Sequence, residues 1–168
     1  LRLVGSEMCI RDRIGGLARH NEIPERKIDF VQARHEEMAA FMAGAHAKFT
    51  GEVGVCIATS GPGAVHLLNG LYDARADHQP VLALVGQQAR TALGGHFQQE
   101  IDLQALFKDV AGSFVQTAMV PAQIRHLIDR AMRIAMGERA VTALIFPNDL
   151  QDLPAVEDLP RAHGIVPS

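Results

Sequence analysis

The chain has 168 residues, with 48% hydrophobic and 21% charged residues and a formal net charge of −3. The charge and the lack of tryptophan argue against binding to nucleic acid or to an anionic membrane. No apolar run approaches the ~20 residues that stable membrane insertion requires. Cys9 and Cys56 are too few for a disulfide framework, which fits a reducing, cytoplasmic setting.

Residues 1–13 fit no later pattern of the chain, and we interpret them as a sequencing artefact or a disordered arm. From there on, short apolar runs alternate with amphipathic stretches. Strands are predicted over residues 27–32, 53–58, 80–86, 111–117 and 141–146, and helices over 35–49, 62–77, 102–107 and 121–136. The first helix carries its large apolar residues at helical spacing, namely Met38, Phe41, Met42, Ala45 and Phe49. In the last helix the predicted buried stripe is Ile124, Leu127, Ile128, Ala131 and Ile134.

Continuous Val/Ile/Leu strands separated by helices predict an α/β fold: a doubly wound, mainly parallel sheet with helices on both faces. We place this domain at residues 14–150 and interpret the polar, proline-containing residues 151–168 as a linker. Ligands of such sheets bind beyond the carboxyl ends of the strands. The segments after Val31, Ala58 and Val85 are therefore the candidate site.

Three segments follow these strands, and each has a structural interpretation besides a functional one. Glu36 and Glu37 open a helix, where a carboxylate also complements the helix dipole. At most one of the two is expected to face the sheet, because neighbouring residues point in different directions. The turn Thr59–Ala64 exposes amides at a helix start but equally suits a tight connection. The loop Gly94–Glu100 either lines a pocket or lies on the surface.

Several common sites are excluded by their spacing. A dinucleotide fingerprint would need glycine where His66 stands, and no phosphate-binding G-K-[ST] loop occurs. The eight histidines show no metal-binding spacing, so we predict no metal site among them. Ser60 lies outside any nucleophile elbow.

Three blocks of sequence, in this order and spacing, carry a resemblance. They are RHEEMAAFMAGAHAKFTG, VCIATSGPGAVHLLNGLYDARADHQPVLALVGQ and GGHFQQEIDLQALFKDVA. Together they resemble the N-terminal, pyrimidine-binding domain of thiamine-diphosphate-dependent enzymes of the pyruvate oxidase and acetolactate synthase type. The resemblance runs from about Ile14 to Leu150 and implies decarboxylation of a 2-oxo acid, with pyruvate as the expected substrate.

The resemblance assigns roles to individual residues. It implies that Glu36 bonds the N1′ nitrogen of the aminopyrimidine ring and so promotes loss of the thiazolium C2 proton, while Glu37 is structural. The resemblance further implies that His66 and Gln98 are catalytic and that Phe97 and Gln98 line the substrate approach. It implies that the pyrimidine pocket is formed by Thr59, Ser60, Gly61, Pro62 and Gly63.

The family's G-D-G motif with a later asparagine, which holds Mg²⁺ and the diphosphate, does not occur in this sequence. The resemblance therefore implies that Mg²⁺, the diphosphate and FAD bind to other domains. It also implies that the partner is the C-terminal domain of another subunit, in a homodimer or homotetramer. On this interpretation the 168 residues are a fragment that is inactive alone.

Two alternatives stay open from the sequence. In the first alternative, the chain is a separate subunit that pairs with a diphosphate-binding partner. In the second, it is a non-catalytic α/β binding module. The second alternative requires Glu36 to be dispensable.

Overall fold

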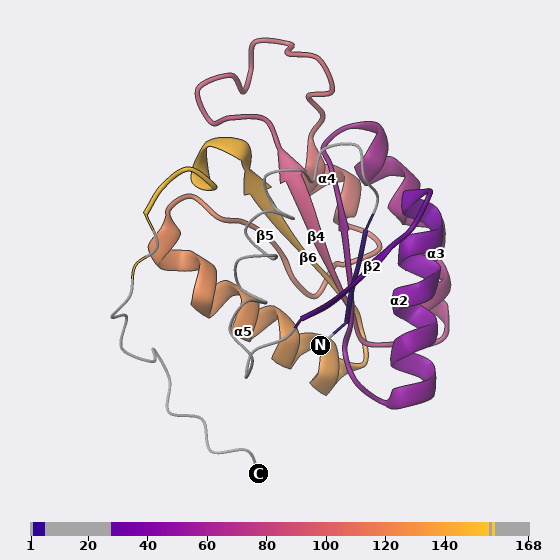
Figure 1. The fold of residues 1–168 in the computed structure, drawn as a ribbon. Coiled ribbons are helices and arrows are strands. Elements are labelled where there is room, and N and C mark those ends of the chain that lie inside the picture. The colour runs from indigo at the N-terminus through magenta and orange to yellow at the C-terminus, as the bar shows by residue number, and fades with distance from the viewer. Residues whose placement is uncertain (1, 6–27, 155, 157–168) are drawn as a thin grey trace.

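The computed structural model describes residues 2–5, 28–154 and 156. This part of the chain forms a parallel sheet in the order β2-β1-β3-β4-β6-β5 (Figure 1). The strands are β1 (Arg2–Gly5), β2 (Asp29–Gln32), β3 (Gly54–Ala58), β4 (Val81–Gln87), β5 (Val115–Thr117) and β6 (Val141–Pro147). The register aligns Gly54 with Val81 and Val81 with Val141, so β3, β4 and β6 begin level.

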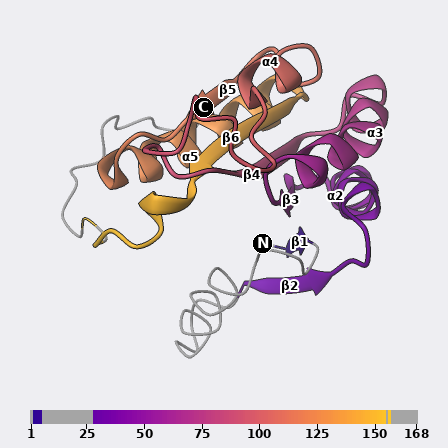
Figure 2. The same cartoon turned by 90° about the horizontal axis from the view of Figure 1, so that it is seen from above.

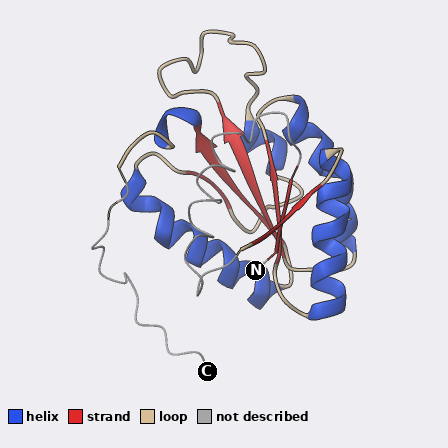
Figure 3. Ribbon diagram, viewed as in Figure 1, coloured by secondary structure: helices blue, strands red, loops and turns tan. Residues whose placement is uncertain are grey.

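Helices cover both faces of the sheet, as expected for a doubly wound fold (Figures 2 and 3). They are α2 (Glu36–Thr50), α3 (Pro62–Ala76), α4 (Leu103–Phe107), α5 (Pro121–Glu138) and the 3₁₀ turn η1 (Asn148–Leu150). Seen from above, α2 and α3 lie on one side and α5 on the other (Figure 2). The predicted α/β class and the order of these elements are confirmed.

Each face of the sheet has its own hydrophobic core, because successive residues of a strand point to opposite faces. Along β4, Val81, Ala83 and Val85 pack toward α2, α3 and α4. Leu82 packs on the other face with Ala131 and Ala135 of α5. The stripe predicted for α5 is confirmed: Ala131 is fully buried, and Leu127, Ile128 and Ile134 are partly buried against this second core.

The interface between α2 and α3 consists of small residues. The buried residues of α2 after Glu36 are Ala39, Ala40, Ala43, Gly44 and Ala47, and those of α3 include Gly63, Ala64, Gly70 and Ala74. A Cβ built on Gly70 would lie 2.6 Å from both Ala40 Cβ and Phe41 N. The two helices are therefore as close together as glycine permits.

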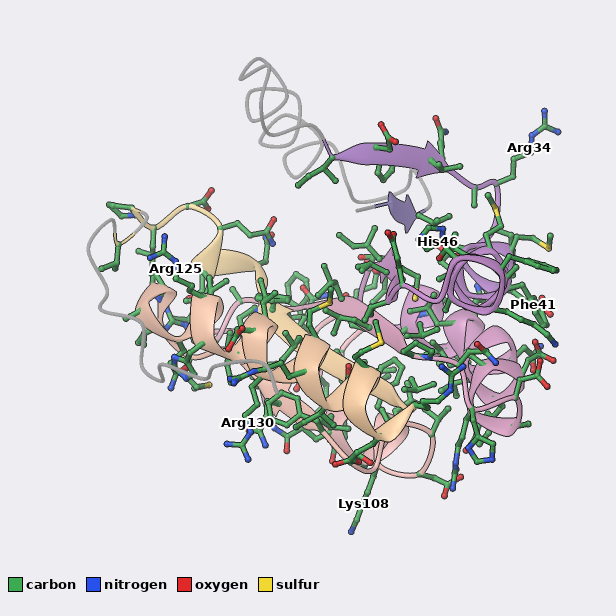
Figure 4. All side chains as sticks on the ribbon, turned by 90° about the horizontal axis from the view of Figure 1, so that it is seen from below. Arg34, Phe41, His46, Lys108, Arg125 and Arg130 are labelled. Atoms are coloured by element: carbon green, nitrogen blue, oxygen red, sulfur yellow. The ribbon has the colours of Figure 1, made fainter. Side chains whose placement is uncertain are left out.

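The large apolar residues of α2 lie on the opposite side of that helix. Met38 is 54% exposed and Phe49 is 85% exposed. Phe41 lies on the outer side of α2, away from the sheet (Figure 4). On α3, Val65 and Tyr72 are also exposed. The helix predicted from the spacing of these residues is thus present. The side of α2 that faces the core, however, is the one formed by alanine and glycine.

Two strands differ from the predictions. No element was expected within residues 1–13, yet Arg2–Gly5 pairs in parallel with both β2 and β3. Its Val4 is 4% exposed and joins the core, which explains why an apolar segment is accommodated between two separated strands. The strand predicted over 111–117 begins only at Val115, because a turn closed by the bond from Phe114 N to Ala111 O precedes it.

Part of the predicted domain organisation lies outside the described residues. Residues 6–27 include the boundary at Ile14, and most of the predicted linker over 151–168 is also not described. Residues 151–154 and 156 are exposed. None of the helices in the described ranges combines the length and apolar character needed to cross a bilayer.

The close approach of α2 and α3 gives a stability prediction. Gly70→Ala should lower the free energy of unfolding by about 1–3 kcal/mol, because the added methyl group overlaps Ala40 and the Phe41 amide. Gly137→Ala in α5 is the control: nothing lies within 4 Å of its new Cβ, and alanine favours a helix by up to about 1 kcal/mol. Urea unfolding of the three proteins measures both effects. An unchanged stability of Gly70→Ala would contradict the packing described.

Candidate functional site

The candidate site lies at the carboxyl edge of the sheet, where three chain segments leave their strands (Figure 1). The segments connect β2 to α2, β3 to α3, and β4 to α4. Of the predicted site residues, Thr59, Ser60, Gly61, Phe97 and Gln98 lie in these segments, whereas Glu36, Pro62, Gly63 and His66 lie near the starts of α2 and α3. The segment after β4 rises as a long loop above the sheet (Figure 1).

The first turn of α2 separates two neighbouring carboxylates. Glu36 is only 8% exposed, although its side chain carries a carboxyl group. Glu37 is more exposed and accepts a hydrogen bond of 3.1 Å from Asn69 Nδ2. As anticipated, only one of the two glutamates faces inward. A buried carboxylate is costly unless it has partners, so Glu36 is the chemically significant one.

The side chain of His66 on α3 contacts Glu36. His66 Nδ1 lies 3.2 Å from Glu36 Oε2, a hydrogen bond that joins the two helices. The His66 ring also stacks on His35, with ring centroids 4.5 Å apart and an angle of 32° between the planes. His35 caps α2 by accepting a 3.3 Å hydrogen bond from the Glu37 amide through Nδ1. The site therefore has one buried carboxylate beside two stacked imidazoles.

The turn between β3 and α3 requires glycine at two positions. Gly61 has a φ of 64°, and a Cβ there would lie 2.7 Å from Gln99 Cβ. A Cβ on Gly63 would lie 2.8 Å from Thr59 Cγ2 and 3.5 Å from Glu36 Oε1. Pro62 begins α3 with its ring in the first helical position. The bare backbone of Gly63 thus lets Thr59 and the Glu36 carboxylate approach the start of α3 closely.

Gln88 connects this turn to the loop after β4. Its Nε2 donates to Ser60 Oγ at 3.1 Å and to the Gln98 carbonyl at 3.0 Å. The preceding Gln87 donates to the Ile101 carbonyl at 3.0 Å. Two side-chain amides at the end of β4 therefore hold the far part of the loop against the turn Thr59–Gly63.

Glu100 organises the loop from within. Its carboxylate accepts hydrogen bonds from the amides of Gly94 at 2.6 Å and Phe97 at 3.0 Å. These two amides lower the pKa of Glu100. The side chains of Phe97 and Gln98 are exposed on this loop, so it is the Gln98 carbonyl that the structure brings to the turn.

The structure gives contacts to residues to which the sequence assigned no role in the site. His35, Gln88, Gln99 and Glu100 all contact the predicted residues or hold their segments. The sequence feature that could have indicated Gln88 is the pair Gln87 and Gln88 directly after the apolar run of a buried strand. No spacing indicated His35, because its ring meets His66 only after α2 and α3 pack together.

The double hydrogen bond of Gln88 gives a prediction for the loop. Gln88→Ala should reduce the hydrogen-exchange protection of residues 94–100 by about tenfold, because two neutral hydrogen bonds of about 0.5–1.5 kcal/mol each are lost. Gln116→Ala, at an exposed position of β5, is the matched control and should leave protection unchanged. Equal protection in the wild type and Gln88→Ala would show that the bridge does not hold the loop.

The amino-acid sequence is similar to those of known proteins. Residues 15–106 match the family described as thiamine pyrophosphate enzyme, N-terminal TPP binding domain. Pyruvate oxidase of Lactiplantibacillus plantarum is 46% identical over 131 residues, which cover 77% of this chain and 22% of that protein. A putative thiamine pyrophosphate-containing protein of Bacillus subtilis is 46% identical over 124 residues, which cover 74% of this chain and 21% of that protein.

An acetolactate synthase of Arthrospira platensis is 37% identical over 147 residues, or 87% of this chain and 24% of that protein. The chain thus spans about a fifth to a quarter of the curated relatives it matches. The family match covers more than half of the 168 residues and includes Glu36, the turn 59–63, His66 and Gln98. The chain belongs to the N-terminal TPP-binding domains of the thiamine pyrophosphate enzymes.

Proposed function

We propose that this domain, at residues 14–150, binds the aminopyrimidine half of thiamine diphosphate through Glu36, in an enzyme that decarboxylates a 2-oxo acid, with pyruvate as the expected substrate. The observation that carries the proposal is the buried Glu36 carboxylate beside the glycine turn at the carboxyl edge of the sheet. Pyruvate oxidase and acetolactate synthase, the printed names of relatives, give the proposed reaction type.

The residues at this edge fit an aminopyrimidine chemically. A carboxylate with little access to water favours a partner that shares a proton with it, as a weakly basic ring nitrogen does. Glu36 would hold that proton at N1′. Thr59, Ser60 and the backbone of Gly61, Pro62 and Gly63 would form the walls for the ring, since it is a glycine, Gly63, that lies next to Glu36 Oε1.

The cofactor, when bound, supplies the electron sink for decarboxylation. The chain's own residues bind, orient and exclude water around it. The contact from His66 to Glu36 fixes the carboxylate from the α3 side, and we assign His66 to the substrate side of the site. Phe97 and Gln98, on the loop held by Gln88 and Glu100, would close over the substrate.

The proposal includes a partner for the exposed side of α2 and α3. Met38, Met42, Phe49, Val65 and Tyr72 are large apolar residues exposed on these two helices. Large apolar residues exposed on two neighbouring helices are typical of an interaction surface. We propose that the C-terminal, diphosphate-binding domain of another subunit covers it in a homodimer or homotetramer, and that Mg²⁺, the diphosphate and FAD bind outside this domain.

We propose that residues 151–168 lead as a linker to the rest of such an enzyme.

Cys56 is a free thiol buried in the core, and burial raises its pKa to about 12. A fully buried, protonated thiol is unreactive and has a structural role. A free cysteine of this kind suits the proposed cytoplasmic location.

A domain exchange tests the proposal. Residues 28–150 would replace the matching region of the Lactiplantibacillus plantarum pyruvate oxidase, and pyruvate-dependent turnover would be measured with thiamine diphosphate supplied. We expect the chimera to be active. Glu36→Gln should lower its kcat by about 10²–10⁴-fold, because the amide cannot hold the proton at N1′.

Glu37→Gln is the matched control, since Glu37 is the adjacent, more exposed carboxylate bonded to Asn69. It should change kcat by less than about threefold, as expected for the loss of one exposed hydrogen bond. A folded chimera whose activity is equally insensitive to Glu36→Gln and Glu37→Gln would contradict the assignment of Glu36 and support a non-catalytic module.

A further inference from the structure

We propose that His35, Glu36 and His66 also form a binding site for a divalent transition metal, with Zn²⁺ as the best chemical match. One ligand atom from each residue lies within 4.8 Å of the others. The three come from the N-terminus of α2 and from α3, so the site forms only when the two helices pack. For this reason the spacing of the histidines in the sequence, which predicted no metal site, did not indicate it.

Two of the three ligands are already at metal-binding separation. Ligands about 2.0–2.1 Å from a tetrahedral metal are about 3.3–3.4 Å apart. Glu36 Oε2 and His66 Nδ1 are 3.2 Å apart, close to this edge length. His35 is stacked on His66 at 4.5 Å between ring centroids, and one of its ring nitrogens is the third ligand. Binding through Nδ1 would give up the 3.3 Å hydrogen bond from the Glu37 amide, which is long and exposed.

The ligand chemistry selects the class of metal. Two imidazoles and one carboxylate suit Zn²⁺, Co²⁺ or Ni²⁺, whereas Mg²⁺ prefers oxygen ligands alone. The side chains of His35 and His66 are 47% and 44% exposed, so a metal and its water ligands have access from solvent. Arg34, the neighbouring cation, extends away into solvent and does not compete for the carboxylate (Figure 4).

A metal at these three residues occupies the carboxylate assigned above to the aminopyrimidine. This consequence rests on the proposed function: Zn²⁺ and thiamine would exclude each other, and a transition metal would act as an inhibitor of cofactor binding. The metal site itself does not depend on that function, because it needs only the three side chains.

The test is a Co²⁺ titration of the full 168-residue chain without a histidine tag, followed by its visible absorption, with Zn²⁺ as competitor. We expect one Co²⁺ to bind per chain and to be displaced by Zn²⁺. The bound Co²⁺ should show the intense visible absorption that is typical of cobalt with a low coordination number. His35→Asn, Glu36→Gln and His66→Gln should each weaken binding about tenfold or more, since even an outer partner of a metal ligand is worth about 10–100-fold. Asparagine at position 35 retains an N-cap for α2.

His126→Gln, at an exposed position of α5, is the matched control and should leave the affinity unchanged. A weak spectrum like that of hydrated Co²⁺, or one-to-one binding that none of the three variants weakens, would overturn the metal site. Simultaneous binding of Zn²⁺ and thiamine would overturn the claim that both use the Glu36 carboxylate. Metal binding in a chain that never binds thiamine would support the metal site and count against the proposed function instead.

Discussion

The close packing of α2 on α3 is the constraint on which the site depends. Glu36 opens one helix and His66 lies near the start of the other, and their 3.2 Å contact exists because the helices touch through alanine and glycine. Gly54 sets the same limit against the sheet, since a Cβ there would lie 2.0 Å from the Ala43 carbonyl. Side chains any larger at these positions would separate the carboxylate from the imidazole.

The same packing explains why the outer side of these helices is apolar. With small residues turned inward, Met38, Met42 and Phe49 are left facing solvent, and Val65 and Tyr72 continue the apolar character on α3. One arrangement of residues thus produces both the internal site and the surface proposed for a partner. The loop after β4 is held by polar contacts: Gln87 and Gln88 donate hydrogen bonds that hold it near the turn, and Glu100 accepts hydrogen bonds from amides within the loop.

Much of the fold could be predicted because its signals are local. Buried strands such as Val81–Gln87 and the stripe of α5 appear directly in the apolar pattern. The side of α2 that faces the core could not be predicted, because Ala39 and Ala43 are less hydrophobic than Met38 and Phe41. For the site, helix geometry predicted that at most one glutamate would face inward, and only the resemblance selected Glu36. The stacking of His35 and the reach of Gln88 depend on tertiary packing that spacing does not encode.

The central claim is that Glu36, within this packed edge, is the partner of an aminopyrimidine ring. The most direct measurement is a titration of the isotopically labelled 168-residue chain with thiamine, followed by the amide NMR signals of residues 59–66. The account predicts saturable shifts in this turn that Glu36→Gln abolishes while the other signals keep their positions. Saturable shifts of equal size in the wild type and Glu36→Gln, or no shifts at all in residues 59–66, would contradict it.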